Sequence, residues 1–352
     1  MSDEHEPKAP IERVMSFPVP WASTQLAAPN ICLRSALFGV SKRGRRELKN
    51  ETLASVNGYT VVYSGERLDQ FDEDVWLTAL DHSKNFGLGA KAPITLRGIA
   101  QRVGIGGGGK DVERVRKSLE RMIHGTVTLH AGPDHEFMGH LVANFKREHD
   151  EYVIRLDPDL VGLFARDQFT LVDAKQRMAL DSYLAKWLHG FVRSHIAVFP
   201  YKVSTIRKLC GSETKELKHF RADLRSALRE LEEKGLVNAW EIDADDLVHI
   251  GHDGSASQAK RLSKSAGSDR RAGSDRPNTA GSDHPKGAGS DRPTTAGSDR
   301  PKPVERGFSP TAVRVLTDQS AGSDRPTLSN TSEQNSKQAP SLFDRLFRRN
   351  RA

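Results

Sequence analysis

The chain is poor in the residues that stabilise small secreted folds or hold structural metals. Its 352 residues include only two cysteines, Cys32 and Cys210, which stand far apart in unrelated surroundings. This excludes a disulfide framework and a paired-cysteine zinc site, and it favours a reducing compartment. No apolar run is long enough to span a bilayer, and the first residues lack the apolar core of a signal peptide. We therefore expect a cytoplasmic protein that binds no metal, cofactor or membrane.

Catalytic constellations are missing as well. The sequence has no histidine pair separated by one apolar residue, which a nicking replication enzyme needs beside its tyrosine nucleophile. The stretch "GIGGGGKD" at residues 104–111 matches the start of a phosphate-binding loop. It departs from that motif at Asp111, where a magnesium-binding Ser or Thr is required. The pattern before the stretch is also helical, whereas a strand precedes a phosphate-binding loop. We interpret this stretch as a turn between two helices, with Asp111 capping the second.

His130, His135 and His140 are spaced for alternating faces of a strand, which indicates the wing of a β-hairpin rather than a metal site. The sequence thus predicts a protein that is not an enzyme.

Composition separates a folded part from a tail. After residue 252 the chain is rich in Gly, Ser, Asp, Arg and Pro and repeats the motif AGSDR or AGSDRP, so it cannot bury enough apolar surface to fold. We predict a disordered repeat linker over residues 253–338 and a short apolar and basic peptide over residues 339–352. From residue 255 onward there are 18 Lys and Arg against 10 Asp and Glu, while the whole chain has 53 against 46, which leaves the first 254 residues with a net charge of about −1. If the folded part binds nucleic acid, it must do so through charge sorted onto one face.

Residues 205–250 carry the clearest local pattern. A short helical stretch at residues 205–209, with Ser204 as its expected N-cap, is followed by the break "CGSE" and by a long amphipathic helix that Gly235 ends. The buried face of that helix is predicted to hold Leu217, Phe220, Leu224, Ala227, Leu228 and Leu231. The opposite face carries Lys215, Lys218, His219, Arg225 and Arg229. Two β-branched runs separated by "DADD" then predict a hairpin, so the unit is a winged helix whose second helix would enter a major groove. The alternative, an ordinary solvated outer face, stays open at this point.

The same plan recurs upstream. "PITL" predicts a strand, residues 96–103 and 110–124 predict two helices, and the strand patterns "TVTLHAG", "HEFMGHLVANFKRE" and "EYVIRLD" suit a wing. The outer face of the second helix carries Lys110, Arg114, Lys117 and Arg121. Residues 171–193 suit a buried packing helix between the two units, and the acidic clusters "DQFDED" and "DADD" suit a helix cap and a hairpin turn. The predicted fold class is α+β, with tandem winged-helix domains and a disordered C-terminal tail.

At this point the sequence resembles the TrfA-like initiators of plasmid replication. The resemblance rests on "PWASTQLAAPNICLRSALFGV", "YSGERL", "DEDVWLTAL", "VGLF", "LCGSETKELKHFRADLRSALRELEEKGLV" and "DDLVHI", in that order, over roughly residues 17–250. It implies a plasmid DNA replication initiator that binds direct repeats, called iterons, in double-stranded DNA at the origin and promotes local opening. It also implies host partners (the host initiator, the replicative helicase and the sliding clamp) and an equilibrium between monomer and homodimer.

The resemblance divides the chain into an N-terminal extension (residues 1–29), a first winged-helix domain for dimerisation and phosphate contacts (30–165) and an iteron-binding second one (166–252). Lys215, Lys218, His219, Arg225 and Arg229 would contact the major groove and phosphates, and Lys110, Arg114, Lys117 and Arg121 would contact phosphates. The relatives carry a clamp-binding Q-L-S-L-F sequence ahead of the first domain, whereas here "QAPSLF" ends the tail with its Gln displaced by one position. Leu342 and Phe343 would insert into the clamp, or this peptide is an amphipathic helix with a basic end. A dimeric winged-helix repressor of its own promoter is the alternative function, and an ATP-dependent enzyme is a remote third.

Overall fold

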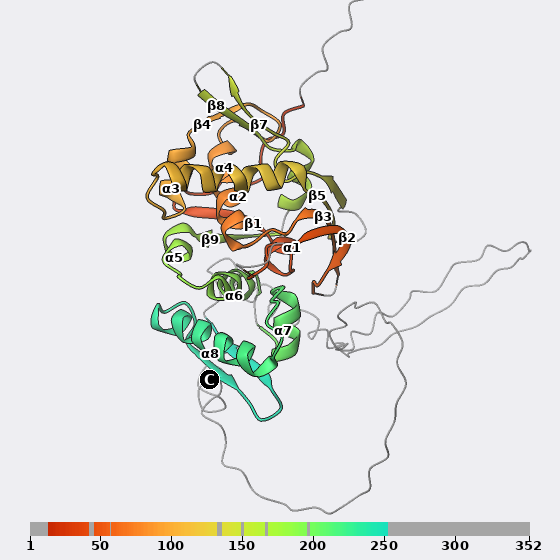
Figure 1. Ribbon diagram of the computed structural model, residues 1–352, viewed down its shortest axis with the longest axis vertical. Helices are drawn as coiled ribbons and strands as arrows, with labels where there is room; N and C mark the ends of the chain where they lie inside the picture. The colour runs from red at the N-terminus through yellow and green to blue at the C-terminus, as the bar shows by residue number, and fades with distance from the viewer. Residues whose placement is uncertain are drawn as a thin grey trace, which may run out of the picture. The chain divides into compact units, whose positions relative to one another are not determined.

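The computed structural model describes residues 13–252 apart from residues 42–45, 57, 132–135, 149–150, 166–167 and 196–197 (Figure 1). The predicted repeat linker and the C-terminal peptide with Leu342 and Phe343 lie outside the described residues. The described part mixes helices and strands along its whole length, in agreement with the predicted α+β content. In this part of the chain, none of the helices combines the length and apolarity that crossing a bilayer requires.

The described chain contains one order of elements twice: helix, strand, helix, helix and two strands. The first module has α2 (Gln70–Ser83), β4 (Ala92–Ile94), α3 (Leu96–Arg102), α4 (Gly109–His124), β7 (Asn144–Glu148) and β8 (Glu151–Arg155). The second module has α6 (Tyr183–Ser194), β10 (Tyr201–Lys202), α7 (Val203–Leu209), α8 (Leu217–Glu233), β11 (Ala239–Ile242) and β12 (Leu247–Gly251). The sheet orders are β4-β8-β7 and β10-β12-β11, so in each module the first strand pairs antiparallel with the last. The modules therefore share one connectivity.

The first module differs from the second by an inserted hairpin. The insertion consists of β5 (Thr126–Ala131) and β6 (Glu136–Gly139), which join β2 (Glu47–Leu53) and β3 (Tyr59–Glu66) in a four-stranded antiparallel sheet of order β2-β3-β5-β6. The prediction that "TVTLHAG" and the first part of "HEFMGHLVANFKRE" form the wing is therefore wrong. The buried residues of β5 extend the buried face of β3, because Leu129 pairs with Val61 and Val127 pairs with Tyr63. His130 lies on this sheet, so its assignment to the wing is wrong as well, and His135 lies outside the described residues.

Several predicted helix boundaries also move. Residues 171–193 do not form one helix but end β9 (Phe169–Asp173) and then form α5 (Ala174–Met178) and α6. Each of the two helices has its own N-cap, because Asp173 accepts a hydrogen bond from Gln176 N at 2.8 Å and Ser182 accepts one from Ala185 N at 3.4 Å. Helix α7 begins at Val203 without a side-chain cap, so Ser204 lies inside it.

Smaller elements join the modules. Strand β1 (Gln25–Pro29) pairs antiparallel with β9, the short helix α1 (Asn30–Leu33) follows β1, and the 3₁₀ helix η1 (Pro158–Phe164) follows β8. Phe169, Leu171 and Val172 of β9 pack in the apolar cluster of the first module. Strand β9, which precedes the second module in the sequence, therefore belongs to the core of the first.

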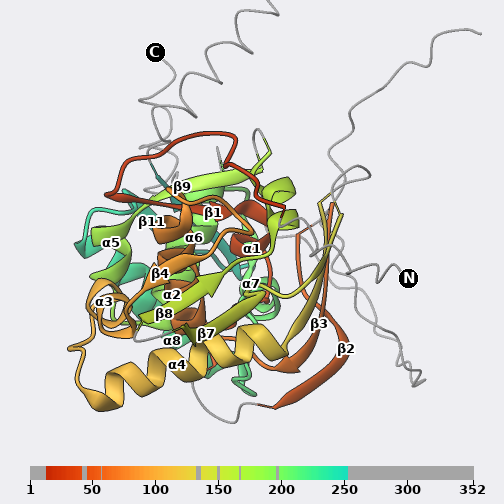
Figure 2. The ribbon, with the colours of Figure 1, turned by 90° about the horizontal axis from the view of Figure 1, so that it is seen from above.

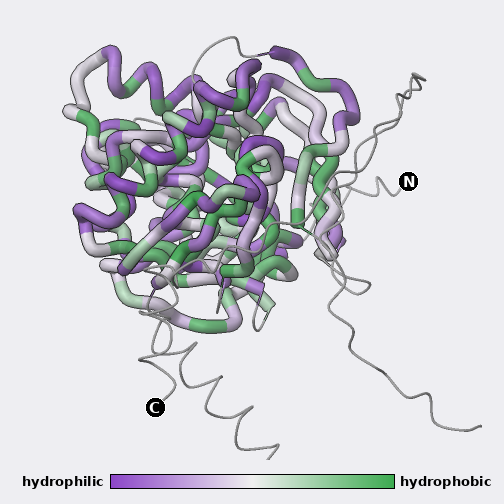
Figure 3. Tube along the Cα trace, turned by 90° about the horizontal axis from the view of Figure 1, so that it is seen from below, coloured by the Kyte–Doolittle hydropathy of each residue, from purple (hydrophilic) through white to green (hydrophobic). Residues whose placement is uncertain are grey.

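The apolar faces predicted for the two long helices are buried. In α8, Phe220, Leu224, Ala227, Leu228 and Leu231 are at most 1% exposed and belong to the cluster of the second module. In α4, Val115, Leu119 and Met122 are fully buried in the cluster of the first module. Hydrophilic and hydrophobic residues alternate along the chain (Figure 3), as expected for elements with one buried face. Burial of each large apolar side chain contributes about 1.5–3 kcal/mol, so these faces fix the orientation of both helices.

Candidate nucleic-acid interface

Helix α8 has defined ends. It begins after a break at residues 210–216 in which Gly211 has φ +61°, so Lys215 precedes the first helical residue, Leu217. At its C-terminus, Leu236 N donates to Leu231 O at 2.8 Å and Gly235 N donates to Glu232 O at 2.9 Å. With Gly235 at φ +66°, this pair of bonds is a Schellman motif, which confirms that Gly235 ends the helix.

The outer face of α8 carries five predicted cations. Lys215, Lys218, His219, Arg225 and Arg229 are all exposed. Asp223 is an exposed acid in the middle of the helix, and the other three acids lie at its C-terminal end. There Glu230 accepts a hydrogen bond from Asp181 N at 2.7 Å and Glu232 accepts one from Trp240 Nε1 at 2.9 Å. These bonds direct the two carboxylates toward the protein. The exposed N-terminal half therefore presents cations to solvent, as a helix in a major groove requires.

The β11–β12 hairpin of the second module has an acidic turn that is bonded to α8. Its turn holds Asp243, Asp245 and Asp246, and Asp246 accepts a hydrogen bond from Arg221 Nε at 2.8 Å. Asp243 accepts bonds from His249 Nε2 and Leu247 N, and these bonds lower the pKa of its carboxyl. The turn role predicted for "DADD" is confirmed. The pair between Arg221 and Asp246 could not be predicted from spacing along the helix, since it depends on where the hairpin folds back.

Of the four predicted cations of α4, the two lysines are exposed and the two arginines contact other side chains. Lys110 and Lys117 are exposed. Arg114 lies over the ring of Phe71 at 3.7 Å and donates from Nη2 to the hydroxyl of Tyr183 at 3.0 Å. Arg121 is 12% exposed and forms an ion pair with the fully buried Asp72, to which its Nε also donates at 3.3 Å.

The outermost charges of α4 balance one another. Arg116 bonds Glu113 at 3.1 Å and Glu120 at 2.9 Å, and all three side chains are exposed by 40% or more. The outer face of α4 therefore carries both signs of charge. Figure 1 shows both helices on the near side with α6 between them, and in Figure 2 both lie toward the lower edge.

The glycine-rich loop before α4 serves the helix itself. The Asp111 carboxylate accepts hydrogen bonds from Gly107 N at 3.0 Å and from Gly108 N at 3.2 Å. Helix α3, not a strand, precedes the loop. The prediction that Asp111 caps α4 is confirmed, and the amides that a nucleotide phosphate would need are bonded to the protein's own carboxylate.

A buried ion-pair network joins the two modules and was missed from the sequence. Asp69 caps α2, as "DQFDED" predicts, but Asp72, Glu73 and Asp74 are almost fully buried. Arg177 of α5 is fully buried and donates from Nε to Asp74 at 2.6 Å and from Nη2 to Glu73 at 3.1 Å. Lys186 Nζ of α6 binds the second oxygen of Asp74 at 2.5 Å. Burial raises the pKa of Glu73 against the opposing charge of Arg177.

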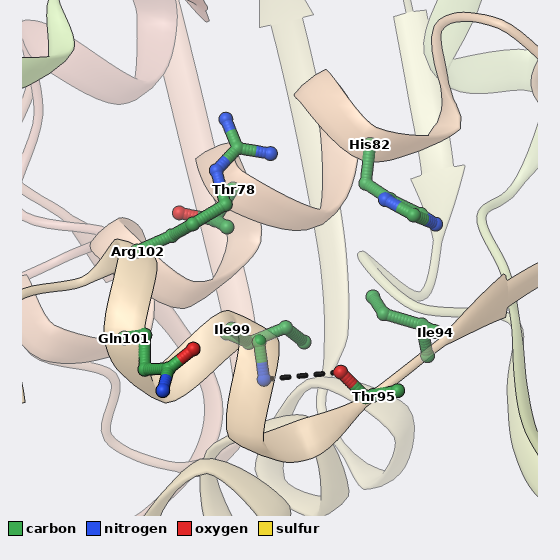
Figure 4. Close-up of a pocket in the computed structure, with 8 residues that line it drawn as sticks. Thr78, His82, Ile94, Thr95, Ile99, Gln101 and Arg102 are labelled. Atoms are coloured by element: carbon green, nitrogen blue, oxygen red, sulfur yellow. Dashed lines mark hydrogen bonds between the residues drawn. The ribbon is translucent and has the colours of Figure 1, made fainter. Parts of the chain in front are cut away.

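A cavity of about 400 Å³ lies in the first module between α2, β4 and α3 (Figure 4). Its two ionisable lining residues have other partners, because His82 Nε2 contacts Pro93 O at 2.5 Å and Arg102 forms an ion pair with Asp81. Within the described residues, no group of three His, Cys, Asp or Glu side chains is placed to hold a metal ion. The geometry that these residues do offer is the exposed basic face of α8.

Comparisons with known proteins agree with the quoted sequence blocks. The family model described as TrfA protein matches residues 13–252. The chain is 29% identical over 245 residues to the plasmid replication initiator protein TrfA of Escherichia coli. That alignment covers 65% of this chain and 62% of the relative, so the chain spans less than two thirds of the relative's length.

A comparison with solved structures matches the chain to domains 2 and 3 of RctB, with a TM-score of 0.46 and 17% identity over 64% of this chain and 99% of that one. Another is the Pi initiator protein in complex with iteron DNA, with a TM-score of 0.32 and 11% identity over 66% of this chain and 100% of that one.

Proposed function

Because the chain belongs to the TrfA protein family, we propose that it initiates replication of a plasmid by binding directly repeated sites, the iterons, in double-stranded DNA at the origin. It acts in the bacterial cytoplasm and opens the adjacent DNA without a catalytic step of its own. The observation that carries this proposal is the row of exposed cations on α8, a helix whose opposite face is buried from Phe220 to Leu231.

Both modules are winged-helix domains in this proposal. The support is their shared connectivity, in which α3 and α4, or α7 and α8, form the helix-turn-helix and the strand pairs β7–β8 and β11–β12 form the wings. Helix α8 lies in the major groove, with Lys218, His219 and Arg225 toward base edges and Lys215 and Arg229 on phosphates. The acidic turn of the β11–β12 wing is turned away from the DNA, because phosphates would repel it.

Helix α4 meets a neighbouring stretch of the duplex mainly through phosphates. Lys110 and Lys117 are the exposed cations for this contact, and Arg114 can join them from its position over Phe71. Arg121 has a structural role instead, because its guanidinium already neutralises the buried Asp72. Moving it to a phosphate would leave that carboxylate without its cation at a cost of several kcal/mol.

The family suggests the remaining partners. We propose that the chain recruits the host initiator and the replicative helicase, binds the sliding clamp, and exchanges between monomer and homodimer. For the clamp, the candidates are Leu342 and Phe343, which lie outside the described residues. Loss of clamp binding in the variant Leu342→Ala, Phe343→Ala is the expected result, measured by pull-down with the purified clamp. Unchanged binding would remove this assignment.

Footprinting and gel shift of the full chain on its plasmid's intergenic DNA, at two salt concentrations, test the DNA-binding proposal. Evenly spaced direct repeats should be protected, and the variant Lys218→Ala, Arg225→Ala should lose that protection. The variant Arg13→Ala, Lys49→Ala removes equal charge from exposed positions outside both helices and should bind normally. Protection of one inverted repeat over the promoter would instead indicate a dimeric repressor. Binding without sequence preference would refute both functions.

A further inference from the structure

The side chain of Arg67, in the first half of the chain, contacts the turn between the two helices of the second helix-turn-helix. It follows β3, and its side chain is only 10% exposed. Its Nη2 donates to Gly211 O at 2.6 Å, and its Nη1 donates to Glu213 Oε1 at 2.7 Å. Both acceptors belong to the break between α7 and α8. One guanidinium thus fixes the segment from which α8 starts.

Two glycines make the space that this guanidinium occupies. A Cβ atom added to Gly39 would lie 3.2 Å from Arg67 Nη2, and one added to Gly211 would clash with the same atom. Gly211 also has φ +61°, which disfavours any other residue there. The Arg67 side chain therefore lies in a slot with one wall from residues before β2 and the other from the second module. We call Arg67, Gly39, Gly211 and Glu213 the Arg67 clasp.

The backbone on either side of the clasp is paired as well. Val40 N donates to Cys210 O at 3.0 Å, and Glu213 N donates to Ser41 Oγ at 3.2 Å. The segments involved are "RSALFGV", "YSGERL" and "LCGSE", which are distant in the sequence and meet here.

A separate bridge joins α4 to α8 through the start of α6. Arg114 of α4 donates to the hydroxyl of Tyr183, and Asp181 N, two residues earlier, donates to Glu230 of α8. Both helices are therefore attached at or just before the start of α6, and the clasp also holds the segment that leads into α8. With two attachments at different points, α8 is restrained from rotating against the first module.

We propose that Arg67 is a positioning residue that holds α8 at one separation from α4, so that the protein accepts only one spacing between the two stretches of DNA that these helices meet. This inference rests on the proposed function. Arg67 itself is too buried to touch DNA. Its effect is that the two modules bind DNA as one rigid unit, with α4 and α8 at a fixed relative position, rather than as two independently moving domains.

The test measures affinity for duplexes with altered spacing. Duplexes are made from the sequence that the wild-type chain protects, either unaltered or with one base pair inserted between the two protected stretches, which displaces one stretch by about 3.4 Å and turns it by about 35°. Wild type should lose at least about tenfold in affinity on insertion. Arg67→Ala should bind the unaltered duplex about tenfold more weakly but should lose less than about threefold on insertion, because α8 can follow the displaced groove.

Further variants separate positioning from general damage to the fold. Arg67→Lys keeps the charge but makes fewer of the bonds, so its insertion penalty should be intermediate. Glu213→Gln keeps the bond to Gly211 and serves if Arg67→Ala does not fold. Arg13→Ala removes an exposed, ion-paired arginine and should keep the wild-type penalty. The same insertion penalty in wild type, Arg67→Ala and Glu213→Gln would overturn the inference. A wild-type chain that binds all duplexes alike would overturn the proposed function, and the inference with it.

Discussion

Arg177→Met is expected to destabilise the protein strongly, because it removes the cation from two buried carboxylates. Arg177 is fully buried, and the side chains of Glu73 and Asp74 are 2% and 1% exposed. Breaking a buried ion pair from one side costs about 3–5 kcal/mol. Lys186 still neutralises Asp74 in the variant, so we expect the lower end of that range, with Glu73 as the uncompensated charge. At about 2–4 °C per kcal/mol for a chain of this size, a loss of about 3 kcal/mol should lower the melting temperature by about 6–12 °C.

The loss should also depend on pH. Burial raises the pKa of Glu73 in the folded state above its ordinary value of 4.5. A carboxyl group with a raised folded pKa favours folding most when it is protonated, and this contribution is lost as pH rises from about 4.5 through the folded value. Removal of Arg177 raises the folded pKa further, so the difference between variant and wild type should be larger at pH 7 than at pH 5.

The assay is urea and thermal unfolding of both proteins at these two pH values. Arg116→Met is the matched control, because Arg116 also bonds two carboxylates, those of Glu113 and Glu120, but does so on the exposed face of α4. It should unfold like wild type. Equal losses in both arginine variants, or a loss in Arg177→Met that does not shrink on acidification, would refute the reasoning.

Three smaller perturbations follow from local geometry. Asp111→Ala should lower stability by about 0.5–2 kcal/mol in urea unfolding, because it leaves Gly107 N and Gly108 N without their carboxylate. Gly235→Ala should cost about 1–2 kcal/mol in the same assay, since its φ of +66° disfavours a side chain. Burial raises the pKa of the Cys210 thiol to about 12, so a thiol reagent at pH 8 should label Cys210 only when the chain unfolds, and fast labelling of the native protein would contradict its burial.

Local periodicity predicted the two long helices well. Helix α4 was expected over residues 110–124 and spans Gly109–His124. Of the apolar residues predicted to be buried in α8, Leu217 at its start is partly buried and the other five are buried. The exposed cations of α8 could be found because a helix places them relative to its own buried face. The strand pairing after α4 could not be found in this way. Alternation shows that β5 has a buried face, but not that β3 is its neighbour.

Side chains whose partners lie far along the chain could not be assigned. The capping role predicted for this acidic cluster holds for Asp72, which accepts a hydrogen bond from Asp69 N at 3.0 Å. The ion pairs of Asp72 and Asp74 could not be predicted, because their partners Arg121, Arg177 and Lys186 stand 49 to 112 residues away. The same limit applies to Arg67, whose acceptor Gly211 is 144 residues distant. Sequence spacing therefore located the candidate DNA-binding surface, while the contacts that orient it required the structure.

The buried network has a consequence for synthesis on the ribosome. Asp74 leaves the ribosome 103 residues before Arg177 and 112 before Lys186. At about 5–20 residues per second, the first module therefore waits about 5–20 s for the cations that neutralise its buried carboxylates. During this interval its final packing would bury charge without compensation. The N-terminal half is thus expected to stay incompletely packed until α5 and α6 emerge, so that the chain completes its folding in one late step.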